Sequence, residues 1–208
     1  MNSQDLEKVR EEAVRALELC SDYTNELASR YAAADGNRYE EGIPVIALCG
    51  PGRCGKDTAG LYISSRYNVN FGASTSFILA HYVAAIQDRT VEDVMATRHD
   101  EGQREYLYEF GNALRRYDPS FLIRSALVEN DIVAGVRAAP ELYSAKADGL
   151  IDLTIWIDNP RVEHDPTLEY RSDDCDLVIR NATSLSDFYG RLDVLCDRLL
   201  KLPRRKAN

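Results

Sequence analysis

Residues 50 to 58 read Gly50-Pro51-Gly52-Arg53-Cys54-Gly55-Lys56-Asp57-Thr58. They match the P-loop pattern of Gly, four residues, Gly, Lys and Ser or Thr, except that Asp57 stands in the last place. Glycines allow a backbone with positive φ to approach phosphate oxygens, and successive N–H groups form a concave anion site. The segment therefore predicts a nucleotide-phosphate site, whose residues are Gly50, Gly52, Arg53, Cys54, Gly55, Lys56, Asp57 and Thr58.

The residues on either side of this loop support the prediction. Residues 44–49 form a short apolar run that is typical of a strand buried on both faces. Residues 58–63 can open a helix, whose positive dipole end would then point at the anion. Strand, glycine-rich loop and helix is the context that the pattern requires.

Asp57 is the departure from the pattern, and it leaves two interpretations open. Ser or Thr at this place normally gives its hydroxyl to Mg²⁺, and a carboxylate is also a hard oxygen ligand for that ion. Thr58 is the next candidate ligand, but it leaves the helix about 100° further round. Alternatively, the carboxylate of Asp57 only complements the helix N-terminus.

The composition limits the class of protein. A chain of 208 residues suits one α/β domain with a helical insertion. The net charge of −9 argues against non-specific binding to duplex DNA. Five scattered cysteines argue against a disulfide framework or a zinc site and favour a reducing cytoplasm. Inside the loop, N–H groups and Lys56 could lower the pKa of the Cys54 thiol, but a small side chain that fills the loop is the favoured interpretation of this residue. No apolar run approaches the roughly 20 residues of a membrane span.

The N-terminal region, residues 1–40, is predicted to be one amphipathic helix over 3–32 followed by a linker. Apolar residues recur at heptad-like spacing, namely Leu6, Val9, Ala13, Ala16, Cys20, Tyr23 and Leu27. Because most of these side chains are small, packing on the protein's own body is expected, with a homodimer as the alternative. Residues 34–37 (Ala-Asp-Gly-Asn) are expected to end the helix.

The remaining chain, residues 41–208, alternates predicted strands and helices. Besides the first strand we expect strands at 67–71, 132–136, 151–157 and 177–179. Helices are expected at 77–87, from Thr90, at 101–117, from Asp118-Pro119, and from Ser184 to about Leu200. This order implies a doubly wound parallel sheet with its ligands at the carboxyl ends of the strands.

The order of motifs resembles that of the phage-type deoxynucleoside monophosphate kinases, which are P-loop nucleotide kinases. The resemblance covers roughly residues 43 to 200, and its most specific part is Gly-Lys-Asp-Thr at 55–58. The other matching residues are Arg104, 109–111 (Glu-Phe-Gly), Arg115, Asp118-Pro119, 135–137 (Gly-Val-Arg), 176–181 and 185–189.

The resemblance implies an ATP-dependent transfer of the γ-phosphate to a deoxynucleoside monophosphate, with Mg²⁺ held by Asp57 or Thr58. An acceptor-binding helical insertion is expected at about 73–130, and a lid-like loop flanked by Arg161 and Arg171 at about 158–175. Phosphoryl transfer depends on positioning and charge stabilisation. The expected catalytic residues are Lys56, Asp57, Arg104 and Arg137, and the expected substrate-binding residues are Ser74, Ser76, Arg104, Arg115 and Arg137.

Each of these roles has a simpler alternative. Arg137 could form a surface ion pair, and Arg104 and Arg115 could be solvated arginines of a helix. Ser74 and Ser76 could serve only as helix N-caps.

One departure from the family affects the expected substrate. Where the family commonly has an acid before Val-Arg, this chain has Gly135, and Asp158 is a candidate replacement. Related phage P-loop enzymes phosphorylate hydroxymethylated pyrimidines in DNA, so the resemblance also leaves open a kinase that phosphorylates 5-hydroxymethylpyrimidine in phage DNA. Modified DNA would then replace the small nucleotide as partner. A nucleotide-binding regulator without turnover is a second alternative.

Overall fold

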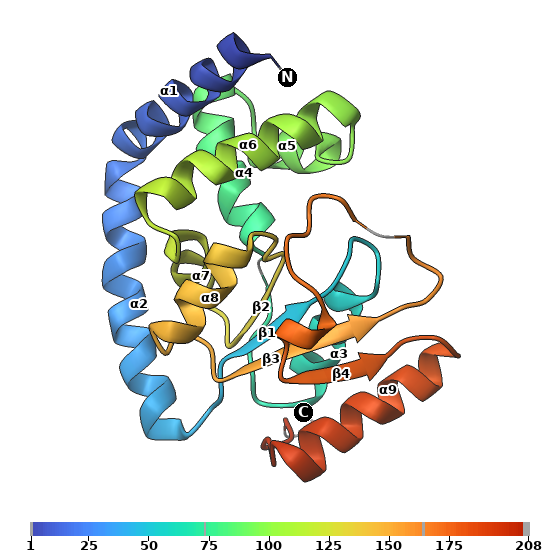
Figure 1. Ribbon diagram of the computed structural model, residues 1–208. Helices are drawn as coiled ribbons and strands as arrows, with labels where there is room; N and C mark the ends of the chain where they lie inside the picture. Colours follow the sequence, from blue (N-terminus) through green and yellow to red (C-terminus); the bar gives the residue numbers. More distant parts are fainter. Residues whose placement is uncertain (1, 73, 164, 206–208) are drawn as a thin grey trace.

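The computed structural model describes residues 2–72, 74–163 and 165–205, without the side chains of Leu27, Tyr31 and residues 34–41. A small sheet lies beside a group of helices, and the N-terminal helices run along the outside of that group (Figure 1). Ala73, the first residue of the predicted insertion, lies outside the described residues, as do residues 206–208.

The sheet has four parallel strands in the order β2-β1-β3-β4. Their bounds are β1 Ile46–Cys49, β2 Ile132–Ala134, β3 Leu153–Asp158 and β4 Leu177–Arg180. In register, Ile46 lies between Ile132 on one side and Leu153 on the other. The prediction of a mixed α/β fold with a parallel sheet is confirmed, and the first strand of the chain is central.

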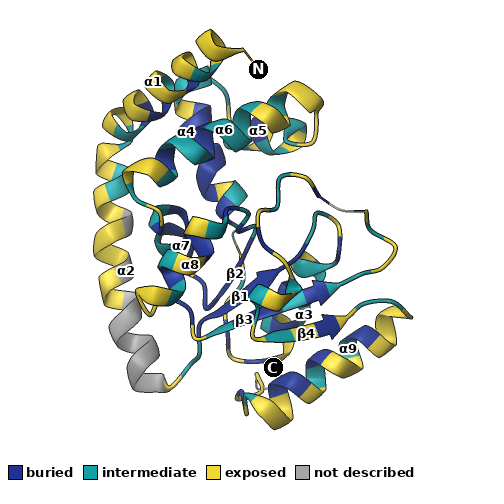
Figure 2. Ribbon diagram, viewed as in Figure 1, coloured by how far each residue is buried: buried dark blue, intermediate teal, exposed yellow. Residues whose placement is uncertain are grey.

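Helices pack against both faces of the sheet because its central strands are apolar on both sides. Ile46 and Leu48 of β1 face α3 (Lys56–Arg66), α9 (Leu185–Val194) and a π-helical turn, Leu195–Leu199. Ala47 and Cys49 face the cluster that includes α8 (Ala139–Ala147) and the other helices. Figure 2 shows β1 and β2 buried and the outer sides of the helices exposed.

The helical part consists of α4 (Thr75–Gln87), α5 (Val91–Thr97), α6 (Glu101–Tyr117) and α7 (Phe121–Ala126). The predicted cap at Thr90 is confirmed, since its Oγ1 accepts a hydrogen bond from Asp93 N at 3.1 Å. The prediction that Pro119 opens a helix is wrong, because Ser120 is the N-cap and α7 begins after it. Asp118 Oδ1 instead accepts the Ser120 N–H at 3.0 Å, which forms a turn before the helix.

The N-terminal region forms two helices, α1 (Ser3–Leu19) and α2 (Ser21–Glu41), which corrects the single helix predicted over 3–32. The chain turns at Cys20, and α2 continues across residues 34–37, since one glycine costs a helix only about 1 kcal/mol. Val9, Ala13 and Ala16 are buried where α1 packs on α4 and α6. The expected packing on the protein's own body is therefore confirmed for α1, and the dimer stays a prediction.

Two further corrections concern short segments. The strand predicted at residues 67–71 is not formed. Tyr67 pairs with Arg204 in an isolated β-bridge, and the carbonyl oxygen of Asn70 accepts hydrogen bonds from the N–H groups of Asp131 and Ile132. Helix α8, which was not expected, follows β2 and has a proline in its first turn. Among the described residues, no helix is long and apolar enough to cross a membrane.

Candidate functional site

The P-loop lies between the carboxyl end of β1 and the start of α3, as predicted. Gly50 and Gly55 have φ of 126° and 110°, in the region that favours glycine. A Cβ on Gly50 would lie 2.9 Å from Ile157 O, and one on Gly55 would lie 2.6 Å from Asn181 Nδ2. Asn181 Nδ2 also donates to Cys54 O at 2.9 Å, so β4 holds the loop in place. Both glycines are therefore required by backbone conformation and by close packing.

Lys56, the first residue of α3, folds back over the loop. Its Nζ donates to Gly50 O at 2.8 Å and to Pro51 O at 2.6 Å. Cys54 lies beside this ammonium group, with 3.6 Å between Nζ and its Sγ. Burial raises the pKa of the Cys54 thiol more than Lys56 lowers it, so the thiol is not activated, and the buried side chain fits the favoured interpretation of a loop filler. The ammonium group is thus held by two carbonyl oxygens of the loop itself.

Asp57 and Thr58 stand in the first turn of α3. Asp57 is exposed and Thr58 is half-buried. The described residues contain no cluster of three or more acidic, His or Cys side chains that could hold a metal by themselves. Either oxygen donor nevertheless fits Mg²⁺, which commonly takes one or two protein ligands together with substrate phosphates.

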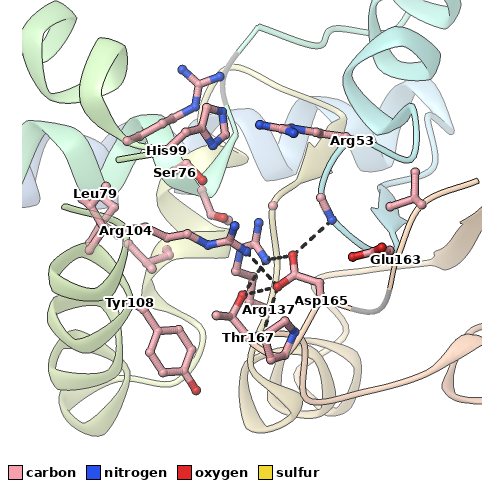
Figure 3. A pocket seen from close by; sticks show the side chains of 18 of the residues that line it. Arg53, Ser76, Leu79, His99, Arg104, Tyr108, Arg137, Glu163, Asp165 and Thr167 are labelled. Carbon is pink, nitrogen blue, oxygen red and sulfur yellow. Dashed lines mark hydrogen bonds and ion pairs between the residues drawn. The ribbon is translucent and has the colours of Figure 1, made fainter. Parts of the chain in front are cut away.

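A cavity of about 570 Å³ opens beside the P-loop. Its walls come from the P-loop, α4, the α5–α6 turn, α6, the end of β2 and the loop after β3 (Figure 3). Its lining contains two carboxylates, Glu163 and Asp165, and six arginines, Arg53, Arg98, Arg104, Arg115, Arg137 and Arg161. The cavity is therefore strongly cationic, although the whole chain carries −9.

The pKa of His99 is affected by this positive charge. Burial lowers the pKa of His99, and repulsion from nearby arginines, Arg98 and Arg53 first among them, lowers it further. A cationic cavity of this size suits a small phosphorylated ligand.

Asp165 is the centre of the polar contacts in the cavity (Figure 3). Its Oδ1 accepts from Arg104 Nη2 at 2.9 Å and from Thr167 Oγ1 at 2.7 Å. Its Oδ2 accepts from Arg137 Nη1 at 2.7 Å and from the Gly52 N–H at 3.2 Å. Burial opposes ionisation, but the hydrogen bonds from Arg137 and Thr167 outweigh it and hold the pKa of Asp165 well below its ordinary value.

Arg137 and Arg104 both reach the cavity, as predicted. Arg137 follows β2 and Arg104 lies on α6, and Asp165 brings their guanidinium groups to one point. Each keeps part of its side chain accessible, 30% for Arg137 and 44% for Arg104. They are placed to contact a ligand in the cavity.

Arg115 lines the cavity as well, but a buried carboxylate holds it. Its Nε donates to Glu141 Oε2 at 2.8 Å, and the Glu141 side chain is fully buried. Burial raises the pKa of Glu141, while the charge of Arg115 opposes that change. Arg115 therefore faces the cavity as a positioned cation, and Glu141 on α8 is a residue that the sequence did not indicate.

The start of α4 forms the wall opposite the P-loop. Ser76 and Thr75 line the cavity, whereas Ser74 is the N-cap residue and its side chain makes no capping hydrogen bond. Gly135 faces this turn with φ of 90°, and a Cβ there would lie 2.8 Å from Thr75 Oγ1. The space that an acid would need at position 135 is therefore filled by Thr75.

The other predicted residues at and after the end of β3 lie partly in the cavity lining and partly outside it. Arg161 lines the cavity and donates to Ala182 O at 3.0 Å, whereas Arg171 lies outside the lining formed by the described residues. Asp158 contacts Arg180 at 3.8 Å and does not line the cavity. Among the described residues the carboxylates that line the cavity are Glu163 and Asp165, so Asp158 does not replace the missing acid.

Comparison with known proteins adds no relative. No protein-family model matches the chain, and no curated protein matches it. The similarity to phage-type kinases thus stays a prediction from the motifs.

Proposed function

We propose that this protein is an ATP-dependent phosphotransferase of the P-loop kinase type, which moves the γ-phosphate of ATP to a deoxynucleoside monophosphate. One observation carries the proposal: a P-loop between a buried strand and a helix opens on a cavity lined by six arginines. Such a loop binds phosphates through its N–H groups, and arginines stabilise the charge that develops during phosphoryl transfer.

The donor nucleotide would bind at the P-loop. The N–H groups of the loop and the start of α3 would hold its phosphates, and Lys56 would exchange its contacts with Gly50 O and Pro51 O for phosphate oxygens. Asp57 or Thr58 would hold Mg²⁺, which neutralises phosphate charge when it is bound. The chain thereby supplies the positioning on which this reaction depends.

The acceptor would bind against the helical wall. Leu79, Leu107 and Leu122 give the cavity an apolar side that suits a base, while Thr75 and Ser76 supply hydroxyls near the start of α4. Arg104 and Arg137 lie between this wall and the P-loop, where a migrating phosphoryl group would pass. Their fixed positive charges would stabilise it.

The size and charge of the site favour a small acceptor. A cavity of about 570 Å³ is in the range of small-molecule sites. A net charge of −9 opposes binding of a DNA polyanion. A free deoxynucleoside monophosphate is therefore the acceptor that we propose.

The test is transfer of label from γ-labelled ATP in the presence of Mg²⁺. Acceptors are the deoxynucleoside monophosphates and DNA that contains hydroxymethyluracil. Label on one or more monophosphates supports the proposal and identifies the base. Label only on the DNA would mean that modified DNA, and not a free monophosphate, is the acceptor. No label on any acceptor contradicts the proposed activity.

A further inference from the structure

The Asp165 carboxylate is surrounded by hydrogen-bond donors of the types that commonly bind phosphate. They are the main-chain N–H groups of Gly52 and Thr167, two guanidinium groups (Arg104 and Arg137) and the Thr167 hydroxyl. The Asp165 side chain is 5% exposed and accepts from all of them. Main-chain N–H groups at a helix-opening loop and forked arginines are the usual partners of phosphate oxygens.

These donors come from separate parts of the chain. Gly52 follows β1, Arg137 follows β2, Arg104 lies on α6, and only Thr167 shares the loop of Asp165. Two guanidinium groups repel each other at short range unless an anion lies between them. Their convergence therefore defines an anion site, and in this structure a side chain of the protein itself fills it.

The same position is where a phosphoryl group would have to pass. Gly52 is within the P-loop, so a phosphate bound there would face the negative charge of Asp165 within a few ångströms. Like charges at such a distance repel strongly in a partly buried site. Asp165 and a phosphate of the ligand consequently compete for the same donors.

The geometry points to a phosphoryl-anion subsite formed by Gly52, Arg104, Arg137 and Thr167, for which Asp165 competes with a phosphorylated ligand as a tethered substitute anion. This inference rests on the proposed function for the identity of the anion. Its consequence is self-inhibition: the affinity for a phosphorylated ligand is reduced by the fraction of molecules in which Asp165 occupies the subsite.

The test is the affinity for inorganic pyrophosphate and for ATP, measured by isothermal titration calorimetry. Asp165→Asn keeps the shape of the side chain and removes its charge, so we expect both ligands to bind about tenfold more tightly. Glu163→Gln is the matched control. It removes one charge from an exposed position in the same loop and the same cavity, and we expect less than about a threefold change.

A second variant guards against a folding defect. Asp165→Ser also removes the charge and must tighten binding in the same direction, with far-UV circular dichroism showing that each variant is folded. Adding Arg137→Gln to Asp165→Asn removes a donor of the subsite and should cancel the gain. Unchanged or weaker pyrophosphate binding in both Asp165 variants would overturn the inference, because the carboxylate would then only position the arginines.

The outcomes separate this inference from the proposed function. If the wild-type protein transfers phosphate but the Asp165 variants bind pyrophosphate no more tightly, the inference fails and the activity stands. If the variants bind pyrophosphate more tightly but no acceptor receives label, the subsite stands and the proposed activity fails.

Discussion

Gly135→Ala tests why this chain lacks an acid after β2. Gly135 has φ of 90°, and the new Cβ would lie 2.8 Å from Thr75 Oγ1, closer than real Cβ atoms approach. Ser74 Cβ and Ser76 Oγ are next, both at 3.5 Å, which is ordinary contact. The substitution therefore combines backbone strain with one specific collision at the acceptor wall.

The expected loss of stability is the sum of these two effects. A left-handed conformation costs a residue with a Cβ about 1–2 kcal/mol. Forcing Thr75 aside adds about 1–2 kcal/mol, at the lower end of the range for overpacking. Alanine also lowers the conformational entropy of the unfolded chain, which stabilises the folded protein by about 0.5 kcal/mol. We expect Gly135→Ala to lower the free energy of unfolding by about 2–3 kcal/mol.

Urea denaturation measures this loss, and Gly149 provides the control. Gly149 has φ of 69°, but nothing lies within 4 Å of a Cβ built there. Gly149→Ala should thus show only the strain, about 1 kcal/mol. In a Thr75→Ala background the colliding Oγ1 is absent, and the cost of Gly135→Ala should fall by about 1–2 kcal/mol.

Two results would refute the reasoning. Equal losses for Gly135→Ala and Gly149→Ala would mean that the collision with Thr75 contributes nothing. An unchanged cost in the Thr75→Ala background would mean that the strain alone explains the glycine. In either case the absence of an acid at position 135 would need another explanation.

Lys56→Ala should lower the rate of phosphoryl transfer about a thousandfold at unchanged melting temperature. Lys8→Ala on α1 is the control and should not change the rate. Equal transfer rates in the Lys56→Ala and wild-type proteins would remove the P-loop assignment. Glu141→Ala removes the ion-pair partner of Arg115 and should lower the free energy of unfolding, measured by urea denaturation, by about 3–5 kcal/mol. Glu7→Ala, which breaks an exposed ion pair, is the control and should lower it by less than about 1 kcal/mol. Because the pKa of Asp165 is lowered in the fold, its ionised form stabilises the protein above its unfolded pKa of about 3.9, and this contribution is lost as pH falls through the lower folded value. The stability advantage of wild type over Asp165→Asn should therefore shrink below about pH 4, and a difference that stays constant from neutral to acid pH contradicts this.

Local patterns in the sequence were sufficient for the centre of the fold. The apolar run before the glycine-rich loop and the helix after it were both identified correctly, because each depends on residues that are adjacent in the chain. The cap at Thr90 and the helix Glu101–Tyr117 were found for the same reason. The parallel sheet followed from the alternation of strands and helices.

Errors arose where a weak local signal competed with packing. The glycine at position 36 does not end α2, since one unfavourable residue does not outweigh a long helix. Residues 67–71 have strand-like composition, but their hydrogen bonds go to the C-terminal segment and to the turn before β2. Helix α8 was missed although Pro140 marks its first turn, and Glu141 with it.

Which charged residues meet in the cavity was decided by tertiary structure. By itself the sequence determined the strand and the helix on either side of the glycine-rich loop, and it indicated the arginines that were candidates to lie near that loop. It could not determine that Asp165 would join Arg104 and Arg137, which are 61 and 28 residues away along the chain. Ion pairs between distant segments have no periodicity or local signature, because only the folded chain brings their charges within hydrogen-bonding distance.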